Sequence, residues 1–140
     1  MAGLWQTVRG LIRSLDADTA SSRLAANARG IELLGQCLSP AQREQYERYN
    51  YFDVIGGDSG KRYRIRHGHQ MNVEVFDKNG TRAHLLCFMP AGRLPVGDVM
   101  LAQKIALELF ETDAIRIANK TLALDDFLDL ERRGHRRFRY

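Results

Sequence analysis

The chain has 140 residues, of which 44% are hydrophobic and 27% charged, and its formal net charge is +4. This composition is typical of a folded globular protein and excludes a disordered chain, and the length fits one domain of ordinary size. The longest apolar runs are far shorter than the ~18 residues of a membrane span. The first 30 residues lack the apolar core of a secretory signal. The two cysteines lie far apart in the sequence and suggest no disulfide framework. We therefore expect a cytoplasmic protein.

Charge is segregated along the chain. Residues 61–97 carry seven basic and two acidic side chains, whereas residues 98–131 carry three basic and eight acidic ones, and residues 132–140 add five arginines. Blocks of opposite sign either bind each other or bind partners. The sequence leaves open whether the acidic block masks the basic residues within the fold.

The spacing of apolar residues predicts two helices at the N-terminus, over residues 4–15 and 19–36, with a break at residues 16–19. A third helix is predicted from Pro40 to about residue 49, because Ser39 and Gln42 form a capping box. The first helix is amphipathic, and its apolar face carries Leu4, Trp5, Val8, Leu11, Ile12 and Leu15.

The pattern then changes from helical to alternating. Four strands are predicted at residues 51–55, 61–67, 70–76 and 82–89. A glycine-rich turn at residues 56–60 joins the first two, and Asn79-Gly80 is a hairpin signal before the fourth. Further helices are predicted at residues 98–110, 112–119 and 124–130.

This order of elements predicts an α+β fold. N-terminal helices precede a four-stranded antiparallel meander, and the C-terminal helices are expected to pack on one face of the sheet. We divide the chain into an N-terminal helical segment (residues 1–38), an α+β domain (residues 39–131) and a basic tail (residues 132–140).

The second predicted strand carries the clearest candidate binding surface. Side chains alternate between the two faces of a strand, so Arg62, Arg64 and Arg66 share one face. Three like charges on one face favour contact with a phosphate-bearing or acidic partner, and phosphate contacts by arginine and lysine dominate nucleic-acid binding. The full set of candidate residues for this contact is Lys61, Arg62, Arg64, Arg66, His69, Arg132, Arg133, Arg136, Arg137 and Arg139.

Two other kinds of site are weaker. The glycine-rich turn before Lys61 does not have the spacing of a nucleotide-binding P-loop, and a strand rather than a helix is predicted to follow it. His67, His69, His84 and Cys87 are residue types that bind zinc, but His84 and Cys87 face opposite ways in a regular strand. The sequence therefore indicates no catalytic residue, no cofactor and no firm metal site.

Several segments resemble small uncharacterised bacterial proteins. The similar stretches are Leu-Ser-Pro-Ala-Gln-Arg-Glu-Gln-Tyr-Glu-Arg, Tyr-Phe-Asp-Val-Ile-Gly-Gly-Asp-Ser-Gly-Lys-Arg-Tyr-Arg-Ile-Arg and Asp-Val-Met-Leu-Ala-Gln-Lys-Ile-Ala-Leu-Glu, within residues 38–119. This resemblance implies a shared module and no particular activity. The hairpin with Cys87 is also similar to SWIM-type zinc-binding modules, but the chain lacks their Cys-x-Cys and Cys-x-His pairs.

Two functional hypotheses follow from the sequence. The first is a non-enzymatic binding module that contacts nucleic acid or another acidic partner through the basic strand face and the arginine-rich tail. The alternative is a protein–protein adaptor or self-associating subunit that uses the N-terminal amphipathic helix, with the charge blocks as contacts between subunits.

Overall fold

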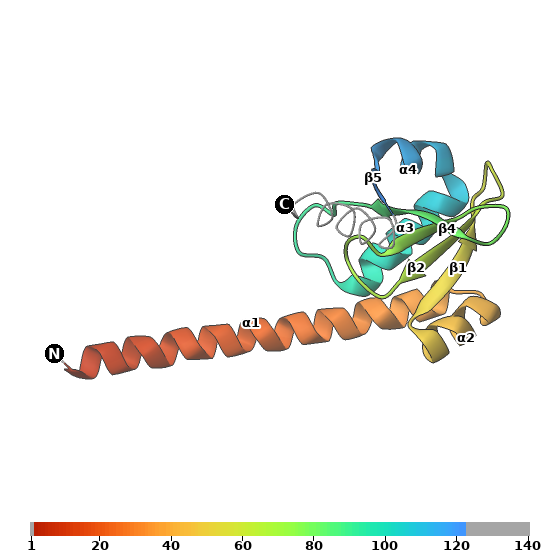
Figure 1. Ribbon diagram of the computed structural model, residues 1–140. Helices are drawn as coiled ribbons and strands as arrows, with labels where there is room; N and C mark the ends of the chain where they lie inside the picture. Colours follow the sequence, from red (N-terminus) through yellow and green to blue (C-terminus); the bar gives the residue numbers. More distant parts are fainter. Residues whose placement is uncertain (1, 123–140) are drawn as a thin grey trace, which may run out of the picture.

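The computed structural model describes residues 2–122, with side chains for residue 17 and residues 19–120 (Figure 1). Its helices are α1 (Ala2–Cys37), α2 (Pro40–Tyr49), α3 (Val96–Leu109) and α4 (Glu111–Ile117). Its strands are β1 (Tyr51–Ile55), β2 (Arg62–Arg66), β3 (Val73–Phe76), β4 (Arg82–Cys87) and β5 (Asn119–Leu122). The strands form one antiparallel sheet in the order β1-β2-β3-β4-β5, so the predicted α+β fold is confirmed.

Two expectations about the elements were wrong. The break expected at residues 16–19 does not exist, because α1 continues through it as a single helix of 36 residues. This stretch contains neither glycine nor proline, so no residue there forces the helix to end. The predicted meander also has a fifth strand, since Asn119–Leu122 pairs with β4 where the sequence suggested the end of a helix. The helix expected at residues 124–130 and the tail lie outside the described residues.

The start of α2 follows the predicted capping box. The Ser39 hydroxyl accepts a hydrogen bond from the Gln42 backbone N–H at 3.2 Å, and the Gln42 side-chain oxygen accepts one from the Ser39 N–H at 3.1 Å. The Gln42 amide also donates to the Asp53 carbonyl at 2.9 Å, which fastens α2 to β1. A local sequence signal therefore fixes both the helix start and its place beside the sheet.

The hydrophobic core lies between one face of the sheet and the helices. Alternate residues of β1, β2 and β3 point inward, and they meet the C-terminal end of α1 together with α3 and α4. The largest fully buried side chains are Tyr63, Phe52, Leu34, Ile65, Leu86, Met100 and Leu107. The opposite face of the sheet carries the polar residues of the same strands.

The α1 and α3 helices touch at a pair of glycines. A Cβ atom placed on Gly97 would lie 2.1 Å from the carbonyl carbon and oxygen of Gly30, well inside any allowed contact. This approach places Leu34 and Leu38 in the core, with 0% and 4% of their surfaces exposed. The rest of α1 runs away from the body of the protein, as Figure 1 shows in red and orange.

Candidate functional site

The outer face of the sheet carries four arginines, which we call the arginine face: Arg62, Arg64 and Arg66 of β2, and Arg82 of β4. Tyr63 and Ile65 alternate with the β2 arginines and are buried on the inner face, as the period-two pattern predicts. The strand thus presents its three arginines together. Whether these arginines can bind a partner depends on which side chains of the protein already contact them.

Asp53 of β1 binds two of these arginines. It lies directly opposite Arg64 in the β1–β2 register, and Arg64 forms a bidentate ion pair with it, with nitrogen–oxygen distances of 2.8 and 3.2 Å. Arg62 reaches the same carboxylate at 3.1 Å. Bidentate arginine–carboxylate pairs are the stronger and more directional kind of ion pair. Asp53 therefore orients Arg62 and Arg64.

Glu74 of β3, on the other side of β2, also binds two arginines. Arg66 and Arg82 approach one oxygen of its carboxylate at 3.0 and 2.9 Å. Only 4% of the Glu74 side chain is exposed, whereas 48% of the Arg66 side chain is exposed. Glu74 is thus a buried carboxylate that carries two cations, and Arg66 is the one of them that extends furthest into solvent.

Aromatic rings fill the spaces between the guanidinium groups. The Arg64 guanidinium carbon lies 3.8 Å from the centre of the Tyr51 ring, and that of Arg62 lies 3.7 Å from the centre of the Phe76 ring. Such cation–π contacts stabilise an arginine in place. They also occupy ring faces that would otherwise be open to stack on a nucleic-acid base.

The ion pairs change the titration of the carboxyl groups. Partial burial acts to raise the pKa of Asp53, but Arg64 and Arg62 outweigh it, so the pKa of Asp53 lies below its ordinary value. Burial likewise acts to raise the pKa of Glu74, and Arg66 and Arg82 reverse the effect and lower it. Both carboxylates therefore stay charged at neutral pH, and the stabilisation they give is lost as acid protonates them.

Among the described residues, the sheet itself supplies carboxylate partners of the arginine face. The carboxylates described in α3 and α4 bind elsewhere: Glu108 pairs with Lys104 at 2.5 Å, and Glu111 binds the glycine-rich turn. Four arginines and two carboxylates leave the face with a formal charge of +2. Counted over the described residues, the face is partly neutralised within the fold and keeps a positive excess.

The sequence offers a signal for these partners that the charge blocks obscure. Asp53 and Glu74 each interrupt an apolar strand, in Phe-Asp-Val and Val-Glu-Val, and such a residue must face away from the core. Antiparallel pairing then sets each of them opposite Arg64. A count of charge along the chain cannot reveal this pairing because the partners come from neighbouring strands.

The glycine-rich turn binds a carboxylate of the protein itself. The backbone N–H groups of Asp58 and Ser59 donate to the Glu111 carboxylate at 2.8 and 2.7 Å, as do the hydroxyls of Ser59 and, at 2.6 Å, Tyr63. In return, the Asp58 carboxylate accepts hydrogen bonds from the Thr112 N–H and hydroxyl at 3.0 and 2.7 Å. The turn therefore has a structural role in anchoring the start of α4.

The carboxyl group of Glu111 is a strong acid for its type. Burial alone acts to raise the pKa of Glu111, but hydrogen bonds from Ser59, Tyr63 and Asp58 outweigh burial and lower its pKa to about 2. Burial, followed by the hydrogen bond donated to Glu111, raises the pKa of Tyr63 above its ordinary value. The pair is therefore a charged acceptor with a neutral hydroxyl donor.

The candidate zinc ligands are not brought together. Nδ1 of His67 lies 2.8 Å from the Tyr46 hydroxyl, and His69 bonds to the Leu94 carbonyl. The other two candidates lie on β4: His84 stands opposite the buried Val75, and the Cys87 sulfur contacts Met89. Within residues 17–120 no group of three or more His, Cys, Asp or Glu side chains is arranged to hold a metal ion.

The remaining predicted site residues differ in what the structure shows. Lys61 and His69 are exposed. The five arginines of the tail (Arg132, Arg133, Arg136, Arg137 and Arg139) lie outside the described residues.

In the part of the chain that the structure describes, no helix has the length and apolar character needed to cross a bilayer. Comparisons with protein-family models, with curated proteins and with solved structures find no match to this chain.

Proposed function

We propose that this chain is a non-enzymatic, cytoplasmic interaction subunit that pairs with a second copy of itself through the N-terminal part of α1. The observation that carries the proposal is the projecting part of that helix, residues 2–22, which leaves the body of the protein and spans about 30 Å (Figure 1). Every side chain described between residues 17 and 25 is exposed, and Leu24 is 71% exposed.

A helix in this position depends on a partner. Most helical stability in proteins comes from the packing of an apolar face rather than from intrinsic propensity. The projecting part also contains weak helix formers, including Gly3, Gly10, Ser21 and Ser22. Packing against another molecule would supply the stabilisation that the body of the protein does not give to these residues.

The sequence of α1 favours a second copy as that partner. Leu4, Val8, Leu11 and Leu15 follow each other at spacings of four, three and four, which is the seam of a coiled coil. This spacing is the same in both directions along the helix. In an antiparallel pair, Leu4 therefore lies opposite Leu15 and Val8 opposite Leu11, which satisfies the self-complementarity that a two-fold interface requires.

We expect Leu11→Asp to convert a dimer into a monomer, because it places a charge in the centre of this seam. The molar mass measured by light scattering during gel filtration should fall by half. Gln6→Asp is the matched control, since Gln6 lies on the opposite side of the helix from the seam and should leave the dimer intact. A wild-type protein that is already monomeric would refute the proposal.

A second candidate function is contact between the arginine face and an acidic partner such as nucleic acid. The positive excess of two charges and the exposed Arg66 side chain favour it. The cation–π contacts of Tyr51 and Phe76 weigh against base stacking. Any binding should therefore be electrostatic and independent of nucleotide sequence.

For this candidate, we expect Arg66→Ala to weaken binding of labelled single-stranded DNA or RNA to the same degree for every sequence. Fluorescence anisotropy at rising salt should show a log–log slope that is smaller by about one in the variant, because one phosphate contact is lost. Arg116→Ala is the control, since this exposed arginine pairs with Asp113 on α4. Failure of the wild-type protein to bind at about 50 mM salt excludes this function.

A further inference from the structure

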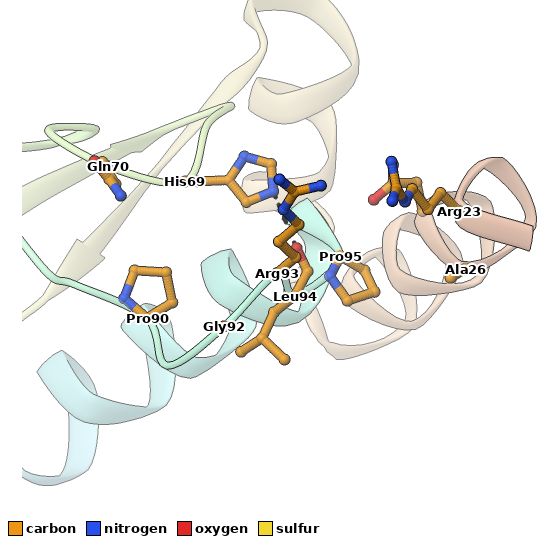
Figure 2. Close-up of a pocket in the computed structure, with 10 residues that line it drawn as sticks. Arg23, Ala26, His69, Gln70, Pro90, Gly92, Arg93, Leu94 and Pro95 are labelled. Atoms are coloured by element: carbon orange, nitrogen blue, oxygen red, sulfur yellow. Dashed lines mark hydrogen bonds between the residues drawn. The ribbon is translucent and has the colours of Figure 1, made fainter. Parts of the chain in front are cut away.

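A cavity between α1 and the loops beside it has the features of an anion site. Its volume is about 420 Å³, and three separate parts of the chain line it: α1, the β2–β3 turn and the β4–α3 loop. Figure 2 shows Arg23 on the helix, with His69 and Arg93 on the loops across from it. This volume lies within the usual range of small-molecule sites.

The lining carries no carboxylate, and its polar side chains are those of Arg23, Asn27, His69, Gln70 and Arg93. Neither Arg23 nor Arg93 forms an ion pair with any residue that the structure describes, in contrast to the arginines of the arginine face. Like charges that converge from distant segments repel each other. An anion bound between Arg23 and Arg93 would attract both guanidinium groups and offset their mutual repulsion.

Two neutral polar side chains, Asn27 and His69, line the cavity beside the arginines. The Asn27 side-chain oxygen accepts a hydrogen bond from the Val96 N–H at 3.4 Å, so its amide N–H₂ is the group left for a ligand. His69 lies 3.1 Å from the Leu94 carbonyl through Nε2, which must therefore carry the proton.

We propose that this cavity binds a small phosphate-bearing molecule, with its phosphate held between Arg23 and Arg93. The planar guanidinium groups match two phosphate oxygens each, which favours phosphate over a halide ion. Pro90 and Leu94 give the same cavity an apolar wall that fits the organic part of a phosphomonoester. The concave shape favours a small molecule over the extended backbone of a nucleic acid.

The test is a titration of the full chain with inorganic phosphate, adenosine monophosphate and adenosine, followed by calorimetry and by amide NMR shifts. We expect both phosphate-bearing probes to bind and to shift the amides of residues 69–70 and 92–95, and adenosine alone not to bind. Arg93→Gln and Arg23→Gln should each weaken the binding of adenosine monophosphate by about tenfold or more. Arg48→Gln is the control, because Arg48 is exposed and pairs with Glu44 on α2.

Three results would overturn the proposal: no binding of either phosphate-bearing probe, shifts confined to the arginine face, or equal weakening by Arg48→Gln and Arg93→Gln. The variants change exposed side chains, so loss of folding does not complicate the outcome. The readout is also independent of self-association, since the seam of α1 lies in residues 4–15 and the cavity begins at Arg23.

Discussion

Replacing Gly97 with alanine is expected to lower the free energy of unfolding by about 3 kcal/mol, because the added methyl group has no room. Its carbon would lie 2.1 Å from the backbone of Gly30. Neither partner can rotate away, because both are backbone groups of packed helices. The α1–α3 crossing must therefore open, and Leu34 and Leu38 would lose part of their burial. Urea denaturation measures the change.

Gly35→Ala is the matched control for this prediction. Gly35 also lies in α1, but nothing stands within 4 Å of a Cβ atom placed on it. Alanine there should stabilise the protein by about 0.5–1 kcal/mol, because it favours the helix without steric cost. Hydrogen exchange adds a local readout: in Gly97→Ala, amides of residues 30–38 should lose protection. Equal stabilities for Gly97→Ala and the wild type would show that the crossing is not close-packed.

The parts of the fold that sequence predicts well are those decided by neighbouring residues. The Ser39–Gln42 capping box depends on four consecutive residues, and it forms as expected. The β2 alternation depends on the strand alone, and it places Tyr63 and Ile65 inward as expected. The Asp77–Gly80 turn is also local, since the Asp77 carboxylate accepts hydrogen bonds from the N–H groups of Asn79 and Thr81.

The parts that sequence misses depend on contacts between distant residues. Glycine lowers helix propensity, yet Gly30 is the position in α1 that lets α3 approach it. Glu111 was one charge in an acidic block, yet it is buried beneath a turn more than 50 residues earlier. The arginine face is the intermediate case. The shared face of Arg62, Arg64 and Arg66 follows from β2 alone, whereas the pairing of the arginines with Asp53 and Glu74 follows only from the sheet register.

Glu111→Gln is expected to lower the free energy of unfolding by about 3 kcal/mol at neutral pH, although the side chain keeps its size. The Glu111 carboxylate accepts hydrogen bonds from two backbone N–H groups and two hydroxyls, and only 3% of the residue is exposed. Glutamine replaces one acceptor oxygen with a donor, which then faces other donors. Glu44→Gln, at an exposed surface ion pair, should change stability by less than about 1 kcal/mol.

The same substitution makes a prediction about pH. The pKa of Glu111 is lowered from 4.5 to about 2 in the folded protein, so its stabilisation is complete above about pH 4.5 and is lost as the pH falls towards 2. The stability difference between wild type and Glu111→Gln should therefore shrink across that range in guanidinium denaturation. Asp53 and Glu74 titrate in both proteins and cancel in the difference. A difference that stays constant from neutral pH to pH 2 would show that the Glu111 charge does not stabilise the turn.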